Sequence, residues 1–198
     1  MSIQPVGCSV LGMPWDSQDT RRRLLEAAIM EFSAYGIAGA RVDRIASAAK
    51  ANKQAIYAYF GSKDALFAAA FDDRIRDFHA SVLFDEHDLA EYGGRMFDKF
   101  EDAPETLRLV LWYQVERVAG PPLEVILDSN EDKVGRIVAA QQEGKVMKTY
   151  PAVALLSFAR STALMWHTQI PELAALFPSD RPDRREIVVR VIRQILEQ

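Results

Sequence analysis

The sequence predicts an all-α fold, in which a small N-terminal three-helix domain precedes a larger helical domain. Three observations support this fold class. Helix-forming residues dominate, and few runs alternate between apolar and polar residues as strands do. Apolar residues recur three and four positions apart, which places them on one face of a helix. Glycine and proline end several of these segments, at Gly36, at Gly120-Pro121-Pro122 and at Gly144.

Composition narrows the class of protein. The chain has 198 residues, 49% of them hydrophobic and 26% charged, which suits a globular protein with a substantial core. Cys8 is the single cysteine, so no internal disulfide can form, as expected in a reducing cytoplasm. No apolar run has the length of a membrane span, and the N-terminus lacks a basic residue ahead of its apolar part. We expect a cytoplasmic protein with a disordered arm over residues 1–17.

The first predicted helix begins at Asp19 or Thr20, either of which can cap it, and ends at Gly36. Its helical spacing gives one apolar stripe, which faces the core of the predicted domain. The stripe consists of Leu25, Ala28, Ile29 and Phe32.

Residues 41–60 predict a helix-turn-helix. Val42, Ile45, Ala46 and Ala49 form the apolar face of a short helix. After a break, Asn52 is a good N-cap for a second helix from Lys53, whose buried side carries Ile56 and Phe60. Gln54, Tyr57 and Ala58 point away from that side, with Lys53, Ala55 and Tyr59 on the flanks. Such a unit presents its second helix to the major groove of DNA.

The charge of the chain is unevenly distributed. Up to Lys63 there are eight basic and five acidic residues, a charge of +3, so the remainder carries −7 within a formal net charge of −4. A basic N-terminal part on an acidic body indicates contact with phosphate at one end of the chain only.

Helical periodicity continues to the C-terminus. The helix over residues 104–119 is apolar nearly all round, which predicts that it is central and buried. No linker rich in Pro, Gly or Ser separates the two domains, so we place their boundary on the fourth helix, with domains at residues 18–78 and 79–198. The further predicted helices cover residues 62–82, 89–100, 104–119, 123–142, 151–167 and 183–197.

The run from about Asp19 to Phe71 resembles the DNA-binding domain of the tetracycline-repressor (TetR) family of transcriptional regulators. The resemblance covers roughly the first third of the chain, and the remainder agrees with the family only in helical character and length. The matching residues, whose spacing also fits, are Thr20-Arg21, Ala27-Ala28, Phe32, Gly36, Val42, Ile45-Ala46, Ala49, Ile56-Tyr57, Tyr59-Phe60 and Ser62-Lys63-Asp64-Ala65-Leu66.

This resemblance implies a double-stranded DNA operator as partner and a recognition helix that begins at Lys53. Gln54 can bond an adenine edge, and Ala55 or Ala58 can contact a thymine methyl group. Tyr57 and Tyr59 resemble family tyrosines that bond phosphate and fix the register. The residues expected to contact DNA are Arg41, Lys53, Gln54, Ala55, Tyr57, Ala58, Tyr59 and Lys63.

Two features of the second helix depart from the family. The family usually has threonines just before this helix, where this chain has Ala40 and Arg41. A capping hydroxyl is therefore missing, and we expect Arg41 to bind phosphate in its place. Asp43 lies where some family members reach a base; its carboxylate can accept from cytosine N4 or repel phosphate, and both interpretations stay open.

For the second domain, the resemblance implies a homodimer built from the last two long helices and a pocket for a small-molecule effector. Many residues suited to the pocket are aromatic or methionine, which suits an apolar or aromatic ligand, although such residues often form plain core. The candidate pocket residues are Phe97, Phe100, Trp112, Tyr113, Glu116, Phe158, Met165 and Trp166. The candidate interface residues are Ala159, Ala163, Val188, Val191, Ile192 and Ile195.

Two charged residues and one histidine of this domain raise further questions. Glu116 and Arg160 lie on otherwise apolar helices, so they either pair with each other or anchor a charged group of the ligand. We expect His167 to be a surface or capping residue.

The sequence as a whole indicates a ligand-responsive transcriptional repressor that binds a near-palindromic operator as a homodimer. An activator remains an alternative. An enzyme is not expected, because the three histidines are scattered and the chain has no metal-ligand spacing, nucleophile elbow or phosphate loop. No cofactor or metal is expected. A helical interaction protein that has lost DNA binding is a further alternative, favoured by Asp43, Gln54 and the missing threonines.

Overall fold

The computed structural model describes residues 14–116, 123–176 and 180–196, and all of its regular structure is α-helical. The all-α prediction is therefore confirmed. The chain divides into two compact units, residues 1–70 and 71–198, and the division falls within α4 (Lys63–Ser81). The predicted boundary between residues 78 and 79 lies on the same helix. No helix in the described ranges is long and apolar enough to cross a membrane.

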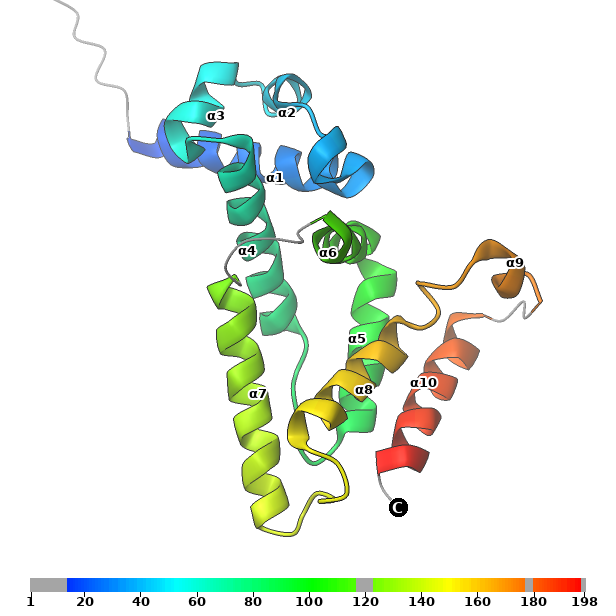
Figure 1. Ribbon diagram of the computed structural model, residues 1–198. Coiled ribbons are helices and arrows are strands. Elements are labelled where there is room, and N and C mark those ends of the chain that lie inside the picture. The colour runs from blue at the N-terminus through cyan, green and yellow to red at the C-terminus, as the bar shows by residue number, and fades with distance from the viewer. Residues whose placement is uncertain (1–13, 117–122, 177–179, 197–198) are drawn as a thin grey trace, which may run out of the picture. The chain divides into compact units, whose positions relative to one another are not determined.

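The first unit contains α1 (Pro14–Gly39), α2 (Val42–Ala48), α3 (Lys53–Phe60) and the start of α4, as Figure 1 shows. Residues 14–17, predicted to belong to the arm, instead form the first turn of α1, where proline is tolerated. The rest of the predicted arm lies outside the described residues. Gly36 has φ 73° and ψ 179°, so it interrupts the helix where the sequence predicted its end.

The core of the first unit is built from the predicted stripe of α1 and from one face each of α2, α3 and α4. Phe32 is fully buried, and its ring meets that of Phe67 edge-on, with 5.1 Å between the centroids. This contact joins α1 to the start of α4. The other apolar residues buried here are Leu24, Leu25, Ala28, Ile29, Ala40, Ile45, Ala46, Ala49, Ile56, Leu66 and Ala70.

In its described residues, the second unit contains the end of α4 and six further helices, with α8 lying between α7 and α5 and with α10 packed on α5 and α8 (Figure 1). One apolar cluster runs through these helices and includes Phe78, Phe97, Ile137, Leu155 and Ile192. The six helices are α5 (Leu89–Asp102), α6 (Pro104–Glu116), α7 (Glu124–Gln142), α8 (Ala152–Leu164), α9 (Pro171–Ala174) and α10 (Arg181–Leu196).

The closest helix packing in this unit depends on two glycines. Gly93 and Gly94 of α5 face α10, where a Cβ added to Gly93 would lie 2.2 Å from Ile192 Cδ1 and one added to Gly94 would lie 2.8 Å from Val189 Cγ2. The pair therefore lets α10 approach α5 within a distance that alanine would prevent. Ion pairs flank the contact; Arg185 of α10, for example, lies 2.6 Å from both Glu91 and Asp98 of α5.

The prediction for the α6 region was wrong in one respect. Thr106, Leu107 and Leu109 are buried, but Val115 is 68% exposed, so the helix is not buried all round. Apolar residues on every face do not require a partner on every face. Helix α9 was not predicted, because four residues are too few to establish a helical period.

Candidate nucleic-acid interface

The start of α2 is held by a carboxylate from α1. Arg41, at the N-cap position, has extended backbone angles and no side-chain cap of its own. Glu31 of α1 instead holds the N-cap residue itself: its Oε1 accepts from the backbone N–H of Arg41 at 2.8 Å and from Arg44 Nε at 2.7 Å. Glu31 is buried, with 8% of its surface exposed, and the guanidinium of Arg44 also lies over the ring of Tyr35. These contacts hold the start of α2 in place, and the guanidinium of Arg44 compensates the charge of the buried Glu31.

The turn between α2 and α3 is formed by local hydrogen bonds. Lys50 adopts a positive φ of 52°, and the N–H of Ala51 donates to the carbonyl of Ala46 at 2.9 Å. Asn52 Oδ1 accepts from the N–H of Ala55 at 2.7 Å, so the predicted N-cap is confirmed. Helix α3 ends at Gly61, whose φ of 79° favours glycine.

Helix α3 exposes the side that the helical wheel predicted. Ile56 is fully buried and Phe60 is half-buried, whereas Gln54 and Ala58 are exposed. Tyr57 and Tyr59 are 46% and 39% exposed, so both hydroxyls belong to the surface and neither ring belongs to the core. Of the two other residues expected on the flanks of this helix, Lys53 is exposed and Ala55 is half-buried. The outward face combines an amide, a phenol and small apolar groups, which can meet base edges and phosphates.

Lys53 and Lys63, two of the residues expected to contact DNA, already have partners within the first unit. Lys53 Nζ lies 3.0 Å from Asp43 Oδ1, which connects α3 to α2, and this hydrogen-bonded carboxylate raises the pKa of Lys53. Lys63 Nζ donates to the carbonyls of Ala38 and Ala40, each at 3.3 Å. Arg41 is exposed. The negative charge of Asp43 partly offsets the positive charge of this surface.

The residues predicted to contact an effector do not lie together on one surface. Phe97 and Phe100 lie in the core of the second unit, where Phe100 stacks on Phe78 with 4.8 Å between the ring centroids. Phe158, Met165 and Trp166 are partly buried against the same cluster. On α6, Trp112, Tyr113 and Glu116 are half-buried, and the ring of Tyr113 lies 4.6 Å from that of Phe71. Arg160 donates from Nη1 to Asn130 Oδ1 at 2.8 Å, so it is hydrogen-bonded to an amide of α7.

His167 is not the surface residue that the sequence suggested. Its side chain is 10% exposed, its ring stacks on Phe97 at 5.4 Å, and Nδ1 lies 3.6 Å from Glu101 Oε1. Burial lowers the pKa of His167, and the nearby Glu101 opposes that effect. The turn after α8 returns the ring to the core, which helix periodicity could not predict.

The predicted interface residues are mostly core residues of their own chain. Ala159, Ala163, Val188 and Ile192 have 0% exposure, because the inner faces of α8 and α10 pack on α5 and on each other. These four are therefore corrected from interface to core. Val191 is half-buried and Ile195 is 40% exposed. Val153, Ser157 and Ser161 of α8 are exposed, whereas the exposed residues of α10 include the charged Glu186, Arg190 and Arg193 beside Ile195.

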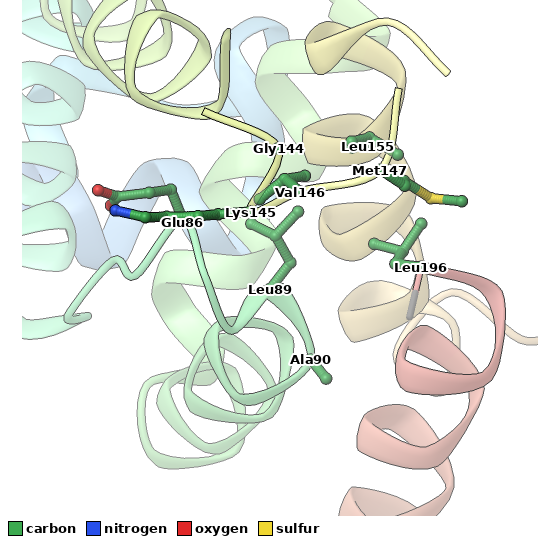
Figure 2. A pocket seen from close by; sticks show the side chains of 9 residues that line it. All are labelled: Glu86, Leu89, Ala90, Gly144, Lys145, Val146, Met147, Leu155 and Leu196. Atoms are coloured by element: carbon green, nitrogen blue, oxygen red, sulfur yellow. The ribbon is translucent and has the colours of Figure 1, made fainter. Parts of the chain in front are cut away.

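A cavity of about 320 Å³ opens where α5 begins and α10 ends. Figure 2 shows the charged side chains of Glu86 and Lys145 on one side of it and Leu196 on the other. None of the predicted effector residues lines it. Its lining residues are Glu86, Leu89, Ala90, Gly144, Lys145, Val146, Met147, Leu155 and Leu196.

This geometry defines a class: a helix-turn-helix unit with an exposed recognition face, followed by an all-helical second unit. Two family profiles agree with it, the bacterial regulatory proteins of the tetR family over residues 24–70 and the tetracyclin repressor-like C-terminal domain over residues 88–194. The chain belongs to the tetR family of DNA-binding transcription regulators. The family resemblance read from residues 19–71 is thus confirmed, and it extends to the C-terminal domain.

Individual relatives agree. The chain is 38% identical over 163 residues to the HTH-type transcriptional repressor SCO4008 of Streptomyces coelicolor, covering 80% of this chain and 83% of the relative. A crystal structure of the transcriptional regulator SCO4942 of Streptomyces coelicolor matches 89% of this chain and 98% of its own, with 34% identity and a TM-score of 0.78. The fold also matches the regulator FadR of Bacillus subtilis in complex with stearoyl-CoA, at 16% identity, 86% and 96% coverage and a TM-score of 0.62.

Proposed function

We propose that this protein is a repressor that binds a near-palindromic operator as a homodimer and leaves it when a small molecule binds. The observation that carries the proposal is the exposed face of α3, where Gln54, Tyr57 and Ala58 point outward from a helix capped by Asn52. Gln54 would read an adenine edge, and Tyr57 and Tyr59 would fix the register on phosphates. The relative SCO4008 is a repressor, which favours this sign of regulation.

The role of each predicted DNA contact follows from its surroundings. Arg41 has an exposed side chain next to the α2 N-terminus, where phosphate is favoured. Lys53 would contribute less than a free lysine, because it shares its charge with Asp43. Lys63 would act through its bonds to the carbonyls of Ala38 and Ala40, so its role is to hold the end of α1. Ala55 and Ala58 would contact thymine methyl groups.

The second unit would supply the dimer contact and the effector site. Val153, Ser157 and Ser161 share an exposed face of α8, and on α10 the half-buried Ile187 and Val191 are in line with the exposed Ile195. Small and apolar side chains there suit the close packing of two copies across a two-fold axis. The partly buried Phe158, Met165 and Trp166 remain the best candidates to contact an effector. Since α4 belongs to both units, it provides a covalent route for the response.

The test is binding of the purified protein to labelled DNA from upstream of its own gene, with random DNA as the control and both titrated in salt. We expect a clear specificity ratio, a steep salt dependence and a protected site of two inverted half-sites. Weak and equal binding to both DNAs, also across genome-wide fragments, would reject the proposal in favour of a helical interaction protein. The proposed place of action is the cytoplasm.

A further inference from the structure

A lysine lies on the inner face of α7. Lys133 is 8% exposed, and its ammonium group donates to the carbonyl of Ser129 at 3.3 Å and to the Ser129 hydroxyl. Both acceptors are neutral, so these bonds satisfy donors of the ammonium without neutralising its charge. Buried lysines are rare unless they are paired, because removing the charge from water is costly.

Two more basic side chains come from other helices of the second unit. Arg160 of α8 donates to Asn130 of α7 at 2.8 Å, again a neutral acceptor. His79 of α4 is half-buried. The charges of Lys133 and Arg160 both disfavour protonation of His79, and the charge of Arg160 disfavours protonation of Lys133. Asn130 and Lys133 are three residues apart on α7 and so lie on one side of that helix, which brings the guanidinium of Arg160 to the part of α7 that carries the ammonium of Lys133.

Four acids of α5 pair with residues outside this cluster. Asp98, Glu91, Glu101 and Asp102 of α5 pair with arginines of α10. Among the ion pairs of the described residues, none includes His79, Lys133 or Arg160. Asp132, whose charge favours protonated Lys133, is an exposed residue of α7. The cluster therefore has net positive charge and no carboxylate bound to it, which an anion would correct.

The surroundings of the cluster are aromatic. Lys133 Nζ lies 5.8 Å from the ring centre of Phe84, which itself meets Tyr92 edge-on at 4.9 Å. Tyr92 is buried, with 3% of its surface exposed. A ligand with a charged head and an apolar body suits such a site better than a free inorganic ion.

We propose that Lys133, Arg160 and His79 form the recognition site for the anionic head, carboxylate or phosphate, of an organic effector. The proposal rests on the proposed function, because it names the chemical class of the molecule that acts on the repressor. Arg160 is the natural bidentate partner of such a head, and Lys133 adds a point charge. The site changes the sequence-based expectation of an apolar effector to that of an amphipathic acid.

The test uses three probes with the same chain, decanoate, decyl phosphate and decanol, and measures their binding by calorimetry without DNA. We expect at least one of the two anions to bind the wild-type protein about tenfold or more tightly than decanol. Lys133→Met and Arg160→Gln should each remove this preference, while Lys148→Gln, which removes an exposed cation of the same unit, should keep it. The two anionic arms separate carboxylate from phosphate recognition.

A preference for an anion that survives both Lys133→Met and Arg160→Gln would overturn the proposal, as would equal binding of decanol. Should none of the three probes bind, sulfate decides: at constant ionic strength it should raise the melting temperature of the wild-type protein more than that of Lys133→Met. An equal response of the two proteins rejects the site. Operator binding measured separately distinguishes the failure of this proposal from that of the repressor function.

Discussion

The carboxylate of Glu31 decides where α2 begins. It bonds the N–H of Arg41 and the guanidinium of Arg44, and it lies in the core side of α1, where an unpaired acid would be costly. The side chain comes from a residue ten positions before Arg41. Glu31 itself does not belong to the exposed face of α3, so its effect on DNA binding would be indirect.

Glu31→Gln should therefore lower the free energy of unfolding by about 1 to 3 kcal/mol, because it removes a charge-assisted bond and leaves Arg44 without its acid. Operator affinity should fall as well, since α2 and α3 lose their fixed position. Urea denaturation measures the first effect. The matched control is Glu26→Gln, which breaks an exposed pair with Arg22 and should cost less than about 1 kcal/mol. Equal losses for the two variants would contradict the capping role.

Asp43 is the second residue whose charge should be measurable. It is exposed and pairs with Lys53 at 3.0 Å, so it reduces the positive charge that the recognition surface offers to phosphate. Asp43→Asn should tighten binding to both operator and random DNA by about three- to tenfold at low salt, and it should steepen the salt dependence by about one unit. Glu131→Gln, an equal change of net charge on α7, is the control. Weaker operator binding alone would instead mean that Asp43 reads a base.

At the scale of the element, the packing of α10 on α5 depends on residues without side chains. Helix propensity alone would make Gly93-Gly94 a weak point of α5. In the structure, the pair makes room for Ile192 and Val189. A glycine in a helix lowers helix propensity, but it also allows the closest approach of a neighbour.

Gly93→Ala should destabilise the second unit by about 1 to 3 kcal/mol, because the new methyl group collides with buried Ile192. The chain offers a matched control on α7: a Cβ added to Gly135 meets nothing within 4 Å. Gly135→Ala should stabilise the protein by about 0.5 to 1 kcal/mol through helix propensity alone. Thermal unfolding of both variants tests the contrast, and stabilisation by both would refute close packing at Gly93.

The helices with a clear apolar period and a cap were predictable, and the contacts between distant segments were not. Asn52 could be identified because a cap acts within three residues of itself. Glu31 and Lys133 could have been suspected as charges beside apolar stripes, but their partners depend on packing. The stripe of α10 was found correctly and assigned to the wrong partner: Val188 and Ile192 face α5 and α8 of their own chain. Periodicity identifies an apolar face without identifying what covers it.

The unfolding free energy of the whole molecule should depend on pH through His79. The pKa of His79 is lowered to about 4, first by burial and then by the charges of Lys133 and Arg160. In the unfolded chain the ring titrates near its ordinary value of about 6.5. The stability that neutral His79 contributes is therefore complete above about pH 6.5 and is lost as the pH falls towards 4, because the unfolded chain binds the proton first.

His79→Gln should flatten the decline of unfolding free energy between pH 6.5 and 4, since the variant takes up about one proton fewer on unfolding. Urea denaturation at a series of pH values measures this slope. His87→Gln changes an exposed histidine and should keep the wild-type slope. An unchanged slope in His79→Gln would show that the ring is as easily protonated in the folded chain as in the unfolded one.

If the exposed face of α3 reads DNA sequence, replacing Gln54 should reduce the preference of the protein for its operator over random DNA. The dissociation constants of wild type and Gln54→Ala are compared on the protected upstream site and on random DNA at the same salt concentration. We predict that the variant loses about tenfold or more in affinity for the site, as expected for one bidentate base contact, and little for random DNA. A specificity ratio that is the same for Gln54→Ala and wild type would contradict the claim.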